Sequence, residues 1–268
     1  MFKYNLKLLF YRKQTFIAIF LIFLTILLHC ALNIYFQANG GMVVENCLSA
    51  ENQIILESVL DFKMYIVLLF PIIGALLFSD ISQIEMKSRT NYLLFNRFNY
   101  KKNIVFRYFF VFLVTFMVFF LALLLEYIIC LMVFKSGSDY HWLDTIGGIR
   151  NISNYNRIFM FQLFTTHPVL YMMIVISIES IVFGALSSFA YSVSLFLNKR
   201  IIIYFVPLII TAASGIFTPK KYKTYTIVKS LQPISFSNAL TYILVVGVLT
   251  AAGIGIMIAG IKKKDLYL

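Results

Sequence analysis

Residues 108–134 read YFFVFLVTFMVFFLALLLEYIICLMVF, and this stretch decides the fold. A helix of that length crosses the ~30 Å hydrocarbon core of a bilayer, and Glu126 is the one charged residue within it. The chain lacks the alternating ~10-residue segments of a membrane β-barrel. Five more apolar runs lie on either side, at residues 16–36, 62–79, 168–197, 201–217 and 240–261. The sequence therefore predicts an all-α membrane protein with six transmembrane helices.

The composition agrees with this class. Of 268 residues, 61% are hydrophobic and 13% are charged, about half the ~25% charged content of a soluble domain. These values exclude a soluble globular enzyme and a disordered chain. The six runs leave no stretch long enough for a soluble nucleotide-binding or catalytic domain, so we expect residues 1–268 to form a single transmembrane domain. Cys30, Cys47 and Cys130 lie far apart and match no metal or redox spacing.

The excess of basic residues predicts the orientation. The chain has 23 Lys and Arg against 11 Asp and Glu. In so apolar a chain this indicates cytosolic loops and anionic lipid headgroups rather than nucleic acid. A cytosolic N-terminus puts most of the basic residues inside, so we expect both termini in the cytosol, although residues 220–229 place a basic cluster outside. Abundant Phe, Ile, Lys and Asn are typical of an AT-rich bacterial genome, which suggests a multi-pass protein of a bacterial plasma membrane.

Residues 80–107 form the cytosolic loop between the second and third runs. Ile81 and Ile84 follow helical spacing, as do Tyr92, Phe95 and Phe98. The loop is therefore predicted to contain short amphipathic helices. One interpretation is a basic elbow that lies on anionic lipid. The other is a docking surface for a cytosolic partner.

The whole pattern resembles the permease subunits of ABC-2 type exporters. The six runs follow a basic segment at residues 7–13, and the tail at residues 260–266 has the basic-Asp-Leu ending common in such permeases. The loop carries an acid, a basic residue with Thr, a Leu pair and an Arg: Glu85, Arg89, Thr90, Leu93, Leu94 and Arg97. Residues 100–104, YKKNI, then re-enter the membrane. Arg89 stands where the family usually has Gly.

The resemblance implies a division of labour. Such permeases carry no ATPase, and two permease chains, identical or different, assemble with two cytosolic ATP-binding subunits. ATP and Mg²⁺ would then bind on that partner, with no cofactor bound directly by this chain. No Gly-x-x-x-x-Gly-Lys-Ser/Thr phosphate loop occurs in the sequence. The resemblance assigns ATPase coupling to Glu85, Arg89, Thr90, Leu94 and Arg97.

Two acids and one histidine lie inside the apolar runs: His29, Glu126 and Glu179. A charge at the bilayer centre costs at least ~2.5–3.5 kcal/mol on insertion scales, so such groups usually face protein or water. They could line a substrate cavity and attract a cationic substrate. Alternatively, the acids pair with neighbouring helices or are protonated. With the resemblance, the first interpretation predicts export of an amphipathic substrate, such as a peptide or a cationic drug.

Other classes remain open at this point. His29, His141 and His167 are dispersed and form no zinc-protease motif, so we assign no catalytic residue and no metal ligand. The aromatic-rich outer segment 140–167 fits either an interfacial helix or a re-entrant gate. A polytopic immunity or anchor protein is the alternative to a permease, followed by an intramembrane enzyme.

Overall fold

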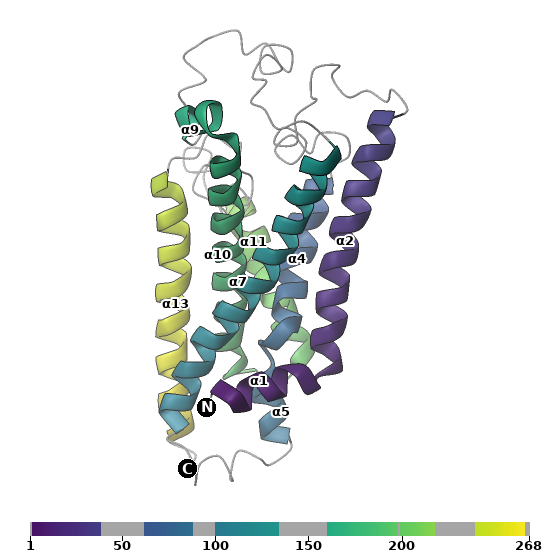
Figure 1. The fold of residues 1–268 in the computed structure, drawn as a ribbon. Coiled ribbons are helices and arrows are strands. Elements are labelled where there is room, and N and C mark those ends of the chain that lie inside the picture. The colour runs from purple at the N-terminus through teal and green to yellow at the C-terminus, as the bar shows by residue number, and fades with distance from the viewer. Residues whose placement is uncertain are drawn as a thin grey trace.

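The computed structural model describes residues 2–38, 62–87, 100–133, 160–197, 199–217 and 239–265. Every secondary-structure element in these ranges is an α-helix, which confirms the predicted all-α class. Figure 1 shows a bundle of long helices with shorter ones at its two ends. The helices are α1 (Phe2–Tyr11), α2 (Lys13–Ala38), α4 (Phe62–Phe78), α5 (Ile81–Lys87), α7 (Tyr100–Val133), α9 (Phe161–Thr166), α10 (Pro168–Ser194), α11 (Arg200–Phe217) and α13 (Ala239–Asp265).

Each of the six apolar runs corresponds to one long helix. Among the described residues, four helices are long and apolar enough to cross a membrane, namely α2, α7, α10 and α13. Helices α4 and α11 are shorter and contain Pro71 and Pro207. The long helices alternate in direction, so both ends of the chain lie at the same end of the bundle (Figure 1). We call this the basal end; it also carries α1 and α5.

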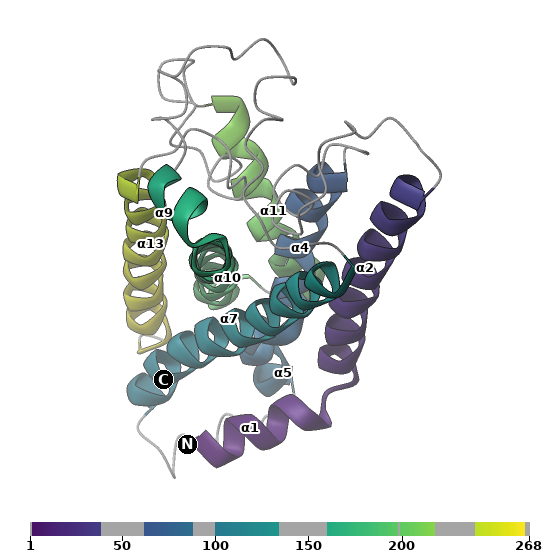
Figure 2. The same ribbon diagram turned by 45° about the horizontal axis from the view of Figure 1, so that its top comes forward.

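Helix α7 is longer than the sequence predicts. Its 34 residues span about 51 Å at 1.5 Å per residue, and it crosses the bundle obliquely (Figures 1 and 2). It begins at Tyr100, eight residues before the apolar run, and so takes in the last part of the loop at residues 80–107. The apolar run stops short of Lys101 and Lys102, which are charged. Both side chains are exposed, so their charges can reach water while the helix continues through them.

Helix α10 lies at the centre and packs against α4, α7, α11 and α13. Its length suggests a tilt, a kink near Gly184 or an extension beyond the membrane, yet the helix runs unbroken past Gly184 to Ser194. A Cβ at Gly184 would lie only 3.1 Å from the Phe112 carbonyl oxygen. The missing side chain therefore lets α10 and α7 approach closely, the usual role of glycine between membrane helices.

The outer surface of the bundle is apolar. Phe20 on α2, Ile201 on α11 and Ile243 on α13 are 64%, 70% and 71% exposed. Exposed apolar faces on several helices would be a liability in water, and they are what a lipid-facing surface requires. The structure therefore supports a protein embedded in a membrane.

Part of the predicted coupling region lies outside the described residues. This holds for Arg89, Thr90, Leu94 and Arg97, whereas Glu85 falls within α5. Most of the outer segment 140–167 and the basic residues at 220–229 also lie outside the described ranges.

Candidate functional site

A buried ion pair joins two turns at the basal end. Arg12 is the non-helical residue between α1 and α2, and Asp80 lies in the two-residue turn between α4 and α5. The Arg12 guanidinium pairs with the Asp80 carboxylate, and the Tyr204 hydroxyl of α11 donates to the other carboxylate oxygen at 2.7 Å. Asp80 is fully buried. We call Arg12, Asp80 and Tyr204 the basal junction.

Further contacts hold Arg12 against the carboxyl end of α4. Its guanidinium donates to the Gln14 side chain at 2.9 Å and stacks 5.4 Å from the centre of the Phe78 ring. The Thr15 hydroxyl donates to the Leu77 carbonyl at 3.0 Å. That carbonyl belongs to the last turn of α4, where backbone acceptors lack helical partners. The start of α2 therefore supplies donors that the end of α4 needs.

The short helix α5 is attached to the end of α10. The hydroxyl groups of Ser82 and Ser194 lie 2.7 Å apart, and the Gln83 amide donates to the Ser194 carbonyl at 2.9 Å and to the Leu197 carbonyl. In the turn directly before α5, the Ser79 hydroxyl donates to the carbonyl of Ser187, farther back on α10, at 2.9 Å. These contacts connect α5 to the end of α10.

Helix α1 is attached to the start of α7 in the same way. The Arg107 guanidinium donates to the Asn5 side-chain oxygen at 3.1 Å, and both side chains are buried. Polar contacts at the basal end thus join α5 to α10 and α1 to α7, and the turn residues Arg12 and Asp80 pair with each other.

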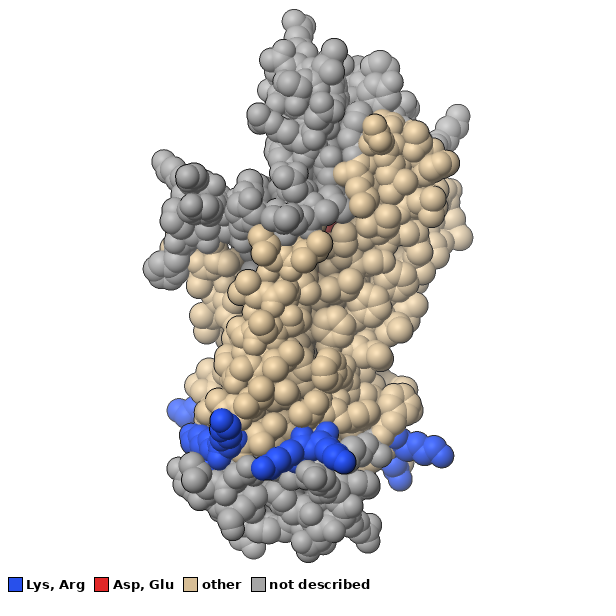
Figure 3. Space-filling view, turned by 90° about the vertical axis from the view of Figure 1, so that its left-hand side faces the viewer, with Lys and Arg blue, Asp and Glu red and all other residues tan. Residues whose placement is uncertain are grey.

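A ring of exposed Lys side chains surrounds this polar network. On the face drawn in Figure 3, the Lys and Arg side chains gather at the basal end. They belong to α1, to the starts of α2 and α7, to the segment before α11 and to the end of α13: Lys3, Lys7, Lys13, Lys101, Lys102, Lys199, Lys262 and Lys263. A positive ring at one end of an apolar bundle is the arrangement that anionic headgroups attract.

A second polar contact lies inside the bundle. His29 Nδ1 on α2 is 2.6 Å from Glu126 Oε1 on α7, and both side chains are buried. Cys30 and Cys130 are buried beside this pair. The structure therefore brings together two of the three polar residues that the sequence singled out.

Glu179 has a different environment on α10. It is half-buried and lies near Tyr171, which also neighbours Tyr242 of α13. Within the described residues no group of three or more His, Cys, Asp or Glu side chains is arranged to hold a metal ion.

The sequence alone did not identify the basal junction. Arg12 and Asp80 stand at the edges of apolar runs, where a charge is normally interpreted as a topology signal or a solvated loop residue. One sequence signal could have indicated the pair. Arg12 lies just before one apolar run and Asp80 just after another, so opposite charges are expected at the same end of two helices. Tyr204 has no distinguishing sequence feature within residues 201–217.

Comparison with known proteins yields no relative. No family model, no curated protein and no solved structure matches the chain. The function must therefore be argued from the geometry. The basal junction joins the residue between α1 and α2 to the turn between α4 and α5 and to α11.

Proposed function

We propose that this chain is the membrane permease subunit of an ATP-driven exporter of the ABC-2 type, in a bacterial plasma membrane. In this proposal six helices cross the membrane, with α4 and α11 completing the set, and both termini are cytosolic. A separate cytosolic subunit binds and hydrolyses ATP with Mg²⁺, and a second permease chain completes the assembly.

The orientation rests on charge and connectivity. Both chain ends and the exposed Lys ring lie at the basal end (Figures 1 and 3). Lys and Arg beside membrane helices favour the cytosolic side. The basal end is therefore the cytosolic end in our proposal, and α5 faces the compartment in which ATP is available.

The attachment of α5 to α10, and of the turn before α5 to α11 and to the start of α2, is the observation that carries the proposal. Ser82 and Gln83 attach α5 to α10, while Asp80, directly before α5, binds Arg12 at the start of α2 and Tyr204 on α11. A partner that pushes on α5 would thus move α2, α10 and α11 together. This is the mechanical requirement for coupling ATP hydrolysis in one subunit to a conformational change in another.

The substrate in this proposal is amphipathic. The apolar interior would accommodate the apolar part of the molecule. For a cationic part, Glu126 and Glu179 are the carboxylates within the bundle, but Glu126 is already directed at His29. Glu179 is half-buried and Glu126 is buried, so Glu179 is the more accessible of the two for a substrate.

Site-specific photo-crosslinking in cells tests the partner. A benzophenone amino acid at position 86 in α5, which leaves Glu85 in place, should capture a protein that carries an ATP-binding domain, identified by mass spectrometry. The same probe at Val248, on the exposed lipid-facing side of α13, is the control and should not capture it. Reversing both charges, with Glu85→Lys and Arg97→Glu, should abolish capture and uncouple ATP hydrolysis from transport, while the membrane level stays unchanged. An unchanged capture pattern and unchanged transport in that double variant would contradict the coupling role.

A further inference from the structure

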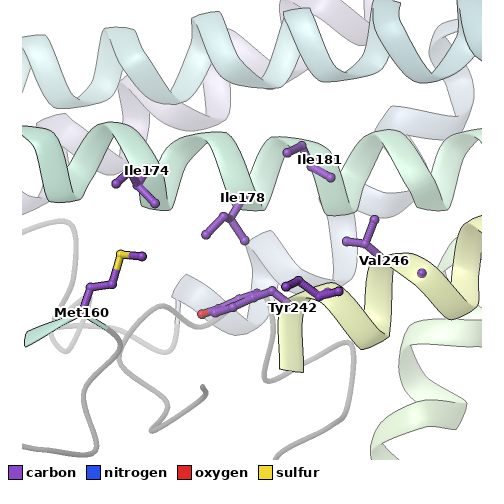
Figure 4. A pocket seen from close by; sticks show the side chains of 8 residues that line it. Met160, Ile174, Ile178, Ile181, Tyr242 and Val246 are labelled. Carbon is purple, nitrogen blue, oxygen red and sulfur yellow. The ribbon is translucent and has the colours of Figure 1, made fainter. Parts of the chain in front are cut away.

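Helices α10 and α13 are in close contact near the basal end and leave a groove near the other end. A Cβ at Gly260 would lie 2.9 Å from the Leu195 side chain, and one at Gly253 would lie 2.8 Å from the Tyr108 hydroxyl of α7. At Gly247 a Cβ would meet no atom within 4 Å. The groove has a volume of about 480 Å³ and is lined by Met160, Ile174, Ile178, Ile181, Tyr242, Ile243, Val246 and Gly247 (Figure 4).

The lining of the groove is aliphatic. Its residues have no charged side chain, and the Tyr242 hydroxyl is the one polar side-chain atom among them. A cavity of this kind offers too few hydrogen-bonding partners to hold ordered water. Its volume falls in the ~300–1,000 Å³ range of ligand sites. The groove therefore suits a flexible hydrocarbon chain rather than a polar molecule.

The position of the groove identifies the source of such a chain. Tyr242 begins the apolar span of α13, at the end opposite the basal end. Ile243 lines the groove and is 71% exposed, so the groove reaches the outer surface of α13. The groove thus opens sideways onto the surface that faces lipid, at a depth where acyl chains are the solvent.

We propose that this groove binds one acyl chain of a membrane phospholipid from the leaflet opposite the basal end. The chain enters beside Tyr242 and Met160 and extends toward Ile181 and Gly247. Tyr242 suits the entrance because tyrosine favours the headgroup level, and Met160 suits it because its side chain adapts to irregular shapes. This site does not depend on the proposed permease function.

Photolabelling of the full chain in phosphatidylcholine nanodiscs tests the site. The probe is a phosphatidylcholine with a diazirine in the middle of one acyl chain, and adducts are assigned to residues by mass spectrometry. We expect more adducts on Ile178 and Ile181, inside the groove, than on Val248, on the open surface. Gly247→Leu fills the groove and should remove the Ile178 and Ile181 adducts while leaving those on Val248.

Gly255→Leu is the matched control, because Gly255 also has open space around it on the same helix. This variant should keep the parent pattern. Adducts on Ile178 and Ile181 that persist in Gly247→Leu at the parent level would overturn the proposal. If Gly247→Leu does not give a folded protein, the parent pattern decides alone: labelling of Ile181 no stronger than that of Val248 would also overturn it.

Discussion

Each buried carboxylate in the described part of the chain contacts a basic group on another helix or turn. Asp80 binds Arg12 and Tyr204, and Glu126 contacts His29. An isolated carboxylate in an apolar environment is costly, so such groups persist only with partners. Asp80 contacts two partners from different elements, Arg12 and Tyr204, whereas Glu126 contacts His29. The fold should therefore depend more strongly on Asp80.

Loss of the Asp80 charge should destabilise the protein. Asp80→Asn leaves the Arg12 guanidinium buried without a counter-charge, and removing one member of a buried pair costs about 3–5 kcal/mol. Tyr204→Phe removes one hydrogen bond to a charged group, for which about 1.5–3 kcal/mol is typical. Thermal unfolding of the purified variants in detergent should therefore rank the parent above Tyr204→Phe and Tyr204→Phe above Asp80→Asn.

Lys13→Gln is the control for this series, since Lys13 adjoins Arg12 but is exposed. Its effect should stay within about 0.5 kcal/mol. Replacing both charged partners, with Arg12→Leu and Asp80→Leu together, should cost less than Asp80→Asn alone. A parent-like melting temperature for Asp80→Asn would show that the ion pair does not stabilise the bundle.

Sequence reasoning could find the intramembrane polar residues but not their partners. His29 and Glu126 stand out because polar groups are rare in apolar runs. Their contact depends on α2 packing against α7, and that neighbour relation has no local sequence signature. The same limit applies to Arg12 and Asp80, which are 68 positions apart. The sequence predicts that each charge lies at a helix end, but it does not predict that the two residues pair with each other.

At the scale of elements, the existence of the helices was easier to predict than their ends. Hydropathy located the apolar part of α7 but not its first eight residues, because a helix continues through Lys and Arg whose charged ends can reach water. Glycine positions were likewise only partly interpretable. Gly253 and Gly260 make the close helix contacts expected of small residues, whereas Gly247 and Gly255 face open space.

A bulky residue at Gly184 should separate α10 from α7. Gly184→Leu must displace the Phe112 backbone and ring, and overpacking of this kind typically costs about 1–3 kcal/mol. Gly255→Leu adds the same side chain at an open position and should change stability by less than about 0.5 kcal/mol. Denaturation of the two variants in detergent provides the comparison. Equal stabilities would mean that the α7–α10 contact tolerates separation.

At the scale of the whole molecule, polar contacts between helices concentrate at the basal end. The remaining interface is mostly apolar and aromatic, as in the stack of Phe119 on Phe183 at 4.4 Å between ring centres. Directional hydrogen bonds fix geometry more tightly than apolar contacts do. The basal end is therefore the part of the bundle whose helices are most firmly tied together.

The topology predicts which positions are protected from outside. In a chain with Cys30, Cys47 and Cys130 replaced by Ala, new cysteines at Lys101 and Lys263 would lie in the exposed Lys ring. A membrane-impermeant maleimide should label neither in intact cells and both after permeabilisation. Labelling of either position in intact cells would reverse the proposed orientation.

The overall architecture follows from the sequence more directly than the site does. Six apolar runs and the asymmetry of basic residues predict the long helices and the shared side of the two termini, and the structure has one helix for each run. Within the described residues, four of these six helices are long and apolar enough to span a membrane. The arrangement around α10 was not predictable, because hydropathy locates each helix along the chain but does not say which helices pack against one another.

The separation of the basal junction along the chain also sets an order of events during synthesis. At about 5–20 residues per second, Asp80 follows Arg12 out of the ribosome by about 3–14 s. Tyr204, a further 124 positions along, follows Asp80 by about 6–25 s. During the first interval the newborn Arg12 has no native counter-charge, and anionic headgroups at the surface are the ones within reach. The basal junction is thus complete only after Tyr204 has been made, 192 positions after Arg12.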